Sequence, residues 1–535
     1  MAAGATGGQI VARTLRRLGV EVIFSVSGNQ ILPIYDAAAD AGLRIIHMRH
    51  ESAAAYAAAV YAERTGQPGV ALTSAGPGFI AGLTGVAVAQ SMELPMLYLS
   101  GAAPLAQRGM GAFQDVAQHR IAGSVCKATL EPPSVERVAA TIARGWRTAR
   151  SGIPGPVHVA LPADVLLATS ATRLRRPIRE ESNGAAMTRA ERAVLDTIAD
   201  RLQEARRPLV IARPAATRGK AGQALRRLCK HLGITPLVTE SPRGLSDQKY
   251  TSIIQQAHRC DVALVVAPAD FAVGFLSSTT LPAASSLLLI DAPGDPRPKR
   301  TPDARSQASP ADALNYLLDA LNGAKVSTDP LWATRLTVDP APAAPLDDEP
   351  DGIHPLAVSD ALREVLAPDD IVVLDGGEFC QWVRLGLRDI ANPLYWNGKL
   401  GAIGGGIPMA IGAAIAQRAG RVFVVLGDGS AGYHLSEYET AARYGIPLVG
   451  IIGNDARWAA EWHMQRSRYG PERAFETLLL PARYDIAARG FGASGLLIED
   501  RTALYRALAE ARAIDDPLCL NVRVAALRSP AEVKH

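Results

Sequence analysis

The chain has 535 residues, of which 48% are hydrophobic and 20% charged, and its formal net charge at pH 7 is +4. Such a length suggests about three domains of ordinary size, and the composition is typical of a globular protein. No apolar run reaches the roughly 20 residues of a membrane span, and the first residues lack a basic and then apolar signal, so we expect no membrane partner and no export. The thinly spread charge argues against a nucleic-acid partner. Five cysteines in no CxxC or zinc spacing suit the reducing cytoplasm.

The first part of the chain predicts an α/β domain over residues 1–171. An apolar run at 45–48 predicts a strand, the Ala-rich stretch 52–61 predicts a helix, and residues 156–162 predict a further strand. The charged, aperiodic residues 172–183 predict a linker that ends this domain.

The middle of the chain predicts a second α/β domain over residues 184–325. It opens with an amphipathic helix at 191–205, and helical patterns then alternate with strands, which indicates a parallel sheet. The predicted strands are 209–212, 262–267 and 287–291.

The last part predicts a third α/β domain over residues 354–535, after a segment rich in Pro, Ala and Asp at 338–355. Residues 357–366 predict a helix, 371–374 a strand and 519–524 a final strand. The fold class expected from the sequence is therefore α/β, with three successive parallel-sheet domains.

Residues 422–455 form the most informative stretch. The predicted elements are a strand at 422–426, a turn at Gly427-Asp428-Gly429, a helix at 434–444 and a strand at 448–452. The carboxylates of Asp428 and Asp455 thus follow successive parallel strands and come to the same edge of the sheet. Carboxylate oxygens are ligands that Mg²⁺ prefers, and glycine N–H groups suit a phosphate, so the pattern predicts a metal and diphosphate site.

The same glycines also satisfy the G-x-G-x-x-G pattern of dinucleotide-binding folds, through Gly427, Gly429 and Gly432, with Asp455 where an acid would bind the ribose. An NAD-dependent oxidoreductase is therefore an alternative. Asp428 argues against it, because its carboxylate would repel a pyrophosphate unless a divalent cation lay between them.

Together with motifs elsewhere in the chain, this stretch resembles the thiamine diphosphate (ThDP)-dependent enzymes, and within them the branch of acetolactate synthases, 2-hydroxyacyl-CoA lyases and oxalyl-CoA decarboxylases. The similarity covers both ends of the chain well and the middle poorly. The other matching segments are 19–24, 28–36, 49–54, 73–78, 111–115 and 401–408. The resemblance implies a pyrimidine-binding first domain, a central domain and a diphosphate-binding last domain.

Glu51 is the candidate catalytic acid. By itself it is typical of a helix-start carboxylate stabilised by the helix dipole. In the family, the matching glutamate hydrogen-bonds the aminopyrimidine of ThDP and so promotes the ylide that carries the chemistry. For this role we expect Glu51 to be buried, with a pKa raised by desolvation. The resemblance adds Gln114, Phe113 and Asn29 as catalytic candidates on the substrate side.

The resemblance assigns cofactor contacts to both terminal domains. Ile403 would hold the two rings of ThDP in a V shape, although an isolated Ile is more often a core residue. Glu378 departs from acetolactate synthases, which carry Gln-His where this chain has Glu378-Phe379, so its role is open. The implied cofactor-binding residues are Gly28, Glu51, Gly76, Gly377, Glu378, Gly401, Ile403, Gly427, Gly429, Ser430 and Asp455.

The implied Mg²⁺ ligands are Asp428, Asp455 and the backbone carbonyl of Arg457. Most of the family has Asn where this chain has Asp455, and the extra negative charge should tighten metal binding. Trp458, Glu461 and Trp462 predict a helix on the substrate side, or else the two tryptophans form an ordinary amphipathic face.

The middle domain decides between close relatives. Residues 240–247 differ from the stretch that precedes the FAD region of acetolactate synthases, so binding of FAD is left open. A basic loop lies in the region where CoA-dependent relatives bind an ADP group, and it is either a phosphate site or a solvated loop. Its cations are Arg297, Lys299, Arg300 and Arg305.

The activity that the resemblance implies is that of a ThDP- and Mg²⁺-dependent C–C bond lyase or carboligase, similar to acetolactate synthase, acting on a 2-oxo acid donor through an enamine intermediate. One alternative is a 2-hydroxyacyl-CoA lyase or oxalyl-CoA decarboxylase-type enzyme with an acyl-CoA substrate. More remote alternatives are the NAD-dependent oxidoreductase and a ThDP-fold subunit without catalysis. The resemblance also implies a homodimer or homotetramer with active sites at the subunit interface, and we expect it in the cytoplasm.

Overall fold

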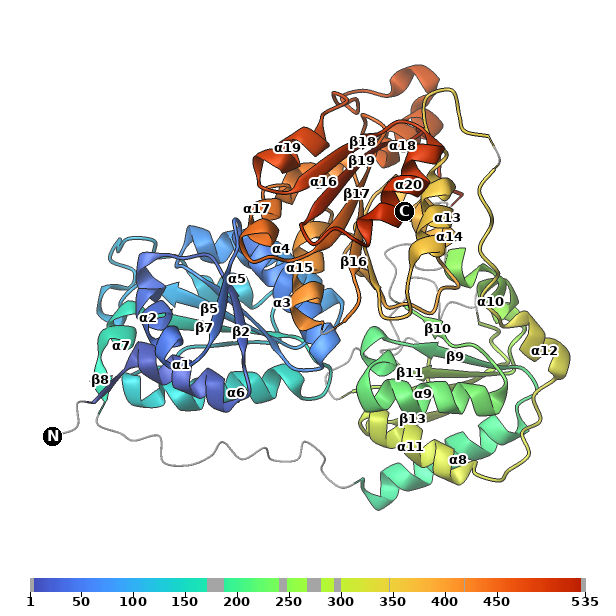
Figure 1. Ribbon diagram of the computed structural model, residues 1–535. Coiled ribbons are helices and arrows are strands. Elements are labelled where there is room, and N and C mark those ends of the chain that lie inside the picture. Colours follow the sequence, from blue (N-terminus) through green and yellow to red (C-terminus); the bar gives the residue numbers. More distant parts are fainter. Residues whose placement is uncertain are drawn as a thin grey trace. The chain divides into compact units, whose positions relative to one another are not determined.

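The computed structural model describes residues 4–170, 187–239, 248–266, 281–292, 300–345, 347–417 and 419–530. The chain divides into two compact units, Met1–Arg179 with Pro342–Ser529 and Glu180–Ala341 with Pro530–His535. In the described residues the first unit holds two six-stranded parallel sheets and the second a five-stranded parallel sheet (Figure 1). The predicted fold class of three parallel-sheet α/β parts is therefore confirmed. The linker predicted at 172–183 lies outside the described residues.

The first sheet has the strand order β3-β2-β4-β5-β7-β6 and is covered by helices on both faces (Figure 1). Ile23 packs into a core with α1 and α6 on one face, whereas its neighbour Phe24 packs against α3 on the other. Both faces of β2 are therefore covered by apolar residues, as expected for a strand inside a buried parallel sheet. The strands are β2 (Val22–Ser25), β3 (Arg44–His47), β4 (Gly69–Thr73), β5 (Met96–Ala102), β6 (Ala128–Leu130) and β7 (Pro156–Pro162). The helices are α1 (Gly7–Arg17), α2 (Leu32–Asp40), α3 (Glu51–Thr65), α4 (Pro77–Ser91), α5 (Gln118–Ala122), α6 (Val138–Arg150) and α7 (Ala163–Leu167).

The second sheet of this unit has the order β15-β14-β16-β17-β19-β18. Its strands are β14 (Ile371–Leu374), β15 (Leu394–Trp396), β16 (Val422–Gly427), β17 (Leu448–Asn454), β18 (Ser494–Ile498) and β19 (Leu518–Arg523). Its helices are α13 (Pro355–Val365), α14 (Glu378–Gly386), α15 (Gly406–Ala416), α16 (Asp428–His434), α17 (Glu437–Arg443), α18 (Ala459–Tyr469), α19 (Tyr484–Gly490) and α20 (Arg501–Ala511).

The two sheets of the first unit are joined through α3 and α15, which share one apolar core. Small residues allow the two backbones to approach closely. A Cβ atom on Gly412 of α15 would lie 2.1 Å from the carbonyl oxygen of Ala57 in α3. The Ala-rich pattern that predicts a helix at 52–61 thus also explains the close contact between the helices.

The second unit has the strand order β10-β9-β11-β12-β13 and its own apolar core. Its strands are β9 (Pro208–Ala212), β10 (Leu237–Val238), β11 (Val262–Val266), β12 (Ser286–Ile290) and β13 (Ala304–Ser306). Its helices are α8 (Arg189–Glu204), α9 (Gly219–Leu232), α10 (Thr251–Gln256), α11 (Pro310–Ala320) and α12 (Pro330–Arg335).

One local prediction is wrong. Gly427-Asp428-Gly429 is not a separate turn, because β16 ends at Gly427 and α16 begins at Asp428. An acid in the first turn is favoured by the helix dipole, and Asp428 also accepts a hydrogen bond of 2.8 Å from the N–H of Gly429. The helix predicted at 434–444 corresponds to α17, and α16 is an additional helix that precedes it.

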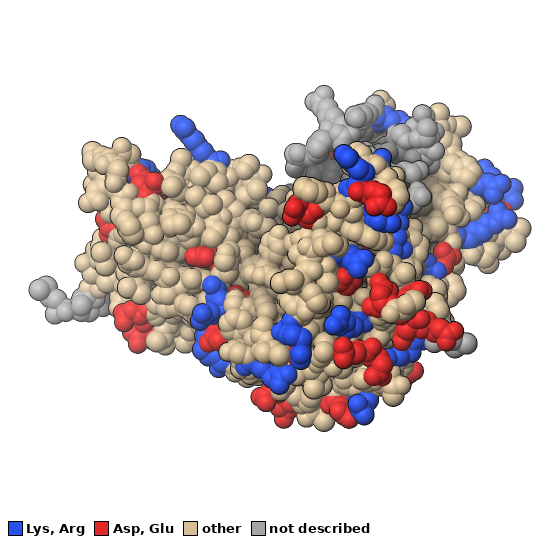
Figure 2. Space-filling model, turned by 90° about the horizontal axis from the view of Figure 1, so that it is seen from above, with Lys and Arg blue, Asp and Glu red and all other residues tan. Residues whose placement is uncertain are grey.

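The surface and the cysteines agree with the composition. Among the described residues on the face in view, acidic and basic side chains are interspersed (Figure 2). All five cysteines are free thiols. Within the described ranges, no helix combines the length and the apolar character that crossing a membrane would require.

Candidate functional site

The carboxyl end of the first sheet carries a group of glycines around Glu51. A Cβ atom on Gly28 would lie 2.4 Å from the hydroxyl oxygen of Ser74, and one on Gly78 would lie 3.2 Å from Oε1 of Glu51. Gly76 has φ +54°, a conformation that favours glycine. The space beside the Glu51 carboxylate therefore depends on residues without side chains. Glu51 itself is half-buried in this chain, so the prediction of a buried acid is wrong for the isolated subunit.

A hydrogen-bonded series places Gln114 beside this group. Ser74 Oγ donates to Gln30 Oε1 at 2.6 Å, and Gln30 Nε2 donates to Gln114 Oε1 at 2.8 Å. Gln114 has φ +60°, which is strained for a residue other than glycine and is often associated with functional sites. Of the candidates on the substrate side, Gln114 is therefore brought to the glycines, whereas Asn29 and Phe113 are exposed in this chain.

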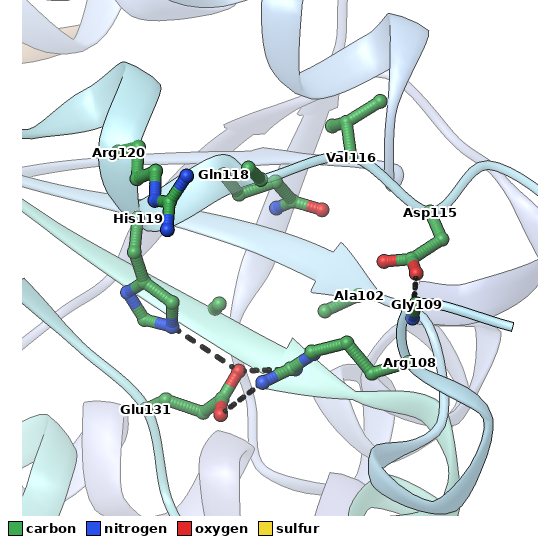
Figure 3. Close-up of a pocket in the computed structure, with 11 residues that line it drawn as sticks. Ala102, Arg108, Gly109, Asp115, Val116, Gln118, His119, Arg120 and Glu131 are labelled. Atoms are coloured by element: carbon green, nitrogen blue, oxygen red, sulfur yellow. Dashed lines mark hydrogen bonds and ion pairs between the residues drawn. The ribbon is translucent and has the colours of Figure 1, made fainter.

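A cavity of about 380 Å³ is lined in part by residues 115–120, the segment that follows Gln114 (Figure 3). Glu131 accepts hydrogen bonds of 2.7 and 2.5 Å from Arg108 and lies 3.3 Å from Nε2 of His119. Burial raises the pKa of Glu131, but the hydrogen bonds from His119 and Arg108 outweigh it and lower this pKa to about 2. The sequence analysis did not identify this charged group, because its members come from three separate elements. The cavity is lined by Ala102, Arg108, Gly109, Asp115, Val116, Ala117, Gln118, His119, Arg120, Glu131 and Ala160.

At the carboxyl end of the second sheet, a buried acid that the sequence analysis missed shapes the glycine-rich loop before α15. Asp375 directly follows β14 and is fully buried. Its carboxylate accepts the N–H groups of Gly376, Gly404 and Gly406 at 2.6, 3.0 and 2.8 Å. Burial raises the pKa of Asp375 to about 6, although these three hydrogen bonds oppose the rise. The sequence feature that could have identified Asp375 is an acid between a predicted strand and a pair of glycines.

Two of the predicted cofactor-binding residues, Ile403 and Ser430, contact Gly376 beside Asp375. A Cβ atom on Gly376 would lie 2.7 Å from Cγ2 of Ile403, so a glycine is required for that side chain to fit. Gly377 and Gly401 have φ +102° and +65°. Ser430 is buried, and its hydroxyl donates to the carbonyl of Gly376 at 3.4 Å.

Glu378 makes a contact that explains its departure from the family pattern. It is buried at the start of α14, and its Oε1 accepts the N–H of Ser529 at 2.6 Å. On the same helix, Trp382 Nε1 donates to the carbonyl of Leu527 at 3.0 Å. Glu378 therefore helps to hold the C-terminal segment against α14.

The predicted metal ligands lie at the ends of β16 and β17. Asp428 is 2% exposed, and its Oδ2 has no hydrogen-bond partner among the described residues. Burial raises the pKa of Asp428 to about 6; burial and the nearby charge of Asp428 raise the pKa of Asp455 to about 8. Asp455 Oδ1 accepts the N–H of Arg457 at 3.2 Å, and Ala456 between them has φ +55°. Two neighbouring acids whose pKa values are both raised, one of them with an unpartnered oxygen, fit a divalent cation.

The protein supplies only part of such a coordination shell. Over the described part of the chain, no group of three or more His, Cys, Asp or Glu side chains is arranged to hold a metal ion. Mg²⁺ usually completes its shell with a backbone carbonyl, water or phosphate oxygens. The two carboxylates therefore suit a cation that is shared with a bound diphosphate.

Tryptophans of the following segment pack against this loop. A Cβ atom on Gly429 would lie 2.7 Å from the ring of Trp458. Trp462 lies between two guanidinium groups, with those of Arg457 and Arg466 at 4.9 and 4.5 Å from its ring centroid. Trp458 therefore borders the glycine turn.

Two arginines of the basic loop in the second unit make contacts within that unit. Arg305 Nη2 forms an ion pair of 2.7 Å with the buried Asp291. Arg300 donates to the carbonyls of Pro282 and Ala283 at 3.0 and 3.1 Å. These contacts favour a structural role for both arginines over a phosphate site. The other parts of the FAD and CoA expectations, residues 240–247, Arg297 and Lys299, lie outside the described residues.

Comparison with known proteins agrees with this geometry. The family model for the thiamine pyrophosphate enzyme N-terminal TPP binding domain matches residues 5–121, and that for the C-terminal TPP binding domain matches residues 375–522. A probable acetolactate synthase of Mycobacterium bovis is 30% identical over 96% of this chain and 95% of its own length. Proteins named 2-hydroxyacyl-CoA lyase 2 from Caenorhabditis elegans and Homo sapiens are each 28% identical, over 97% and 92% of this chain and 89% and 85% of their own lengths.

The fold is thus that of an α/β enzyme, and its candidate site lies at the carboxyl ends of two sheets. The chain belongs to the thiamine pyrophosphate enzyme family and is a ThDP-dependent enzyme related to acetolactate synthases and 2-hydroxyacyl-CoA lyases. This result argues against the two remote alternatives, an NAD-dependent oxidoreductase and a ThDP-fold subunit without catalysis.

Proposed function

We propose that the chain is a ThDP- and Mg²⁺-dependent C–C bond lyase or carboligase that acts on a 2-oxo acid donor. The observation that carries the proposal is the buried, unpartnered Oδ2 of Asp428 beside a second acid, Asp455. Such a pair is costly to keep ionised unless a cation lies between the acids, and a diphosphate supplies the remaining oxygen ligands.

In this proposal, residues 1–171 form the pyrimidine-binding domain, residues 184–325 the central domain and residues 354–535 the diphosphate-binding domain. When bound, ThDP supplies the carbon nucleophile that attacks the donor carbonyl and stabilises the electron pair left by C–C cleavage. Glu51 holds a proton at the aminopyrimidine. The diphosphate side comprises Gly377, Gly427, Gly429 and Ser430, with Asp428, Asp455 and the carbonyl of Arg457 on the metal.

Four residues bind the rest of the cofactor. Ile403 and the backbone at Gly401 orient its rings, and Gly28 and Gly76 leave room for the pyrimidine. We place Gln114, Phe113 and Asn29 on the donor side, since Gln114 is tied to the glycines beside Glu51 through Gln30. The exposed Phe113 and Asn29 then face the site across a subunit interface, which supports a homodimer or homotetramer.

An acyl-CoA donor is the second candidate, because relatives named 2-hydroxyacyl-CoA lyase 2 align over most of this chain. The contacts of Arg300 and Arg305 within their own domain make it the weaker one, since neither guanidinium is left for an ADP phosphate.

The test is calorimetric titration of the metal-stripped protein with ThDP, with and without Mg²⁺, followed by pyruvate and a 2-hydroxyacyl-CoA on the loaded sample. We expect ThDP binding that depends on Mg²⁺, and turnover of pyruvate only. Turnover of the thioester alone would select the second candidate. Absence of ThDP binding would contradict both.

A further inference from the structure

Glu437 makes an unusual contact between the two sheets of the first unit. It is fully buried at the start of α17, and its two backbone partners precede it by 388 and 387 positions in the sequence. Its Oε1 accepts the backbone N–H groups of Arg49 and His50 at 3.0 and 3.2 Å. Its Oε2 accepts the hydroxyl of Thr440 at 2.6 Å. The two backbone donors belong to the two residues immediately before Glu51.

The residue after Glu51 is held from the same side. Ser52 Oγ lies 2.8 Å from Nε2 of His434, the last residue of α16. Nδ1 of His434 hydrogen-bonds the carbonyl of Gly404, and a carbonyl only accepts, so Nδ1 carries a proton. Burial lowers the pKa of His434 to about 4, so its ring is neutral and Nε2 accepts the Ser52 hydroxyl proton. Glu51 is therefore flanked on both sides by residues fixed to α16 and α17.

Ordinary packing does not account for a buried carboxylate at this place. The contact of α3 with α15 is made by small apolar residues, and an apolar side chain in place of Glu437 would support this contact equally well. Burying an ionisable group costs free energy that hydrogen bonds only offset. Apolar contacts are also non-directional, whereas two hydrogen bonds to one oxygen fix the position of the backbone that donates them.

We propose that Glu437 is a positioning residue that fixes the backbone before Glu51 and thereby sets where the Glu51 carboxylate points. The catalytic meaning of this role rests on the proposed function of Glu51. Because both backbone N–H groups bind Oε1, an uncharged carbonyl oxygen at the same place is sufficient to hold this backbone. The charge of Glu437 is not required.

The first experiment measures amide hydrogen exchange of residues 49–54 in the protein without cofactor. We expect Glu437→Ala to raise exchange about tenfold or more in this segment and not in α1, because the two N–H groups lose their acceptor. Glu437→Gln should exchange like the wild type, since its amide oxygen accepts both N–H groups. Glu439→Gln is the matched control, because Glu439 lies two residues away on the same helix and pairs with the side chains of Arg443 and Arg49, whereas Glu437 binds the backbone N–H groups.

The second experiment measures turnover and ThDP affinity of the same variants. We expect Glu437→Ala to lower kcat about ten- to a hundredfold with KM and ThDP affinity within about twofold, and Glu437→Gln to restore kcat. Loss of activity in Glu437→Gln equal to that in Glu437→Ala would overturn the positional role, as would unchanged exchange at 49–54 in Glu437→Ala.

Two further results keep the inference testable. If Glu437→Ala does not fold, Thr440→Val takes its place, because this variant removes the hydroxyl that holds Oε2 of Glu437. We expect smaller changes in exchange and in kcat in the same direction. Exchange and kcat equal to those of the wild type would contradict the inference. A wild-type protein that fails to bind ThDP would end the proposed function, whereas the exchange experiment would still decide whether Glu437 fixes this segment.

Discussion

At the residue scale, the burial of Glu437 makes the stability of the protein depend on pH. Burial raises its pKa from the ordinary 4.5 to about 7, against the hydrogen bonds from Thr440 and the amides of Arg49 and His50 and the charge of Arg49. The folded state therefore binds this proton more tightly than the unfolded state. The resulting stabilisation is complete below about pH 4.5 and is lost as the pH rises through about 7.

Glu437→Gln removes this titration, and its stability relative to the wild type should therefore increase between about pH 5 and about pH 8, by roughly 1–3 kcal/mol. Urea unfolding of both proteins at the two pH values measures the difference. Glu439→Gln is again the control, since the pKa of Glu439 is lowered by Arg443 and its carboxylate is partly exposed. Parallel pH dependence of the wild type and Glu437→Gln would contradict the argument.

A second prediction at this scale concerns the acid that replaces the family's Asn. Asp455→Asn removes one of two neighbouring negative charges, and we expect Mg²⁺ affinity to fall about three- to thirtyfold while ThDP still binds at high Mg²⁺. Asp428→Ala should lose ThDP and Mg²⁺ binding together, because it removes the buried ligand itself. Calorimetry with and without Mg²⁺ distinguishes the two variants. Tighter Mg²⁺ binding in Asp455→Asn would show that the second charge is not on the metal.

At the element scale, the local sequence pattern was sufficient to predict the strands and helices named in the sequence analysis in most cases. The run at 371–374 is β14 with the same bounds, and 156–162 is β7, because each is a short apolar segment bounded by turn residues. The glycine turn after β16 was misjudged, since Gly and Asp favour turns locally, whereas here the helix begins at once and the acid lies at its first position.

The contact between α3 and α15 gives a prediction for a single glycine. Gly412→Ala adds a methyl group that would lie 2.1 Å from the carbonyl oxygen of Ala57, so the helices must separate. We expect a net loss of roughly 1–3 kcal/mol in unfolding free energy, even though alanine favours the helix itself. Gly490→Ala on α19 is the control, because nothing lies within 4 Å of its added Cβ atom. Equal stability of the two variants, measured by urea unfolding, would mean that the helices are not closely packed.

At the scale of the whole molecule, the sequence predicted which segments carry the site but not how they are held. Family motifs predicted Glu51, Asp428 and the glycine loops as candidate site residues, because the cofactor chemistry requires these residue types. Asp375 was missed, since two of its three hydrogen bonds come from Gly404 and Gly406, which follow 29 and 31 positions later in the chain. The contact of Glu437 with Arg49 spans 388 positions and has no local pattern at all.

The arrangement of the site between subunits can be tested with two inactive variants. Glu51→Gln should bind ThDP without turnover, and Asp428→Ala should fail to bind it. If each cofactor lies between Glu51 of one subunit and Asp428 of another, a mixed dimer of the two variants has one site with both substitutions and one with neither. Random mixing by co-expression should then restore about a quarter of the wild-type activity. A site built within one chain always retains one of the two substitutions, so in that case the mixture would stay inactive. The activity of a mixed dimer purified through a different tag on each variant, compared with that of each variant alone, therefore decides between the two arrangements.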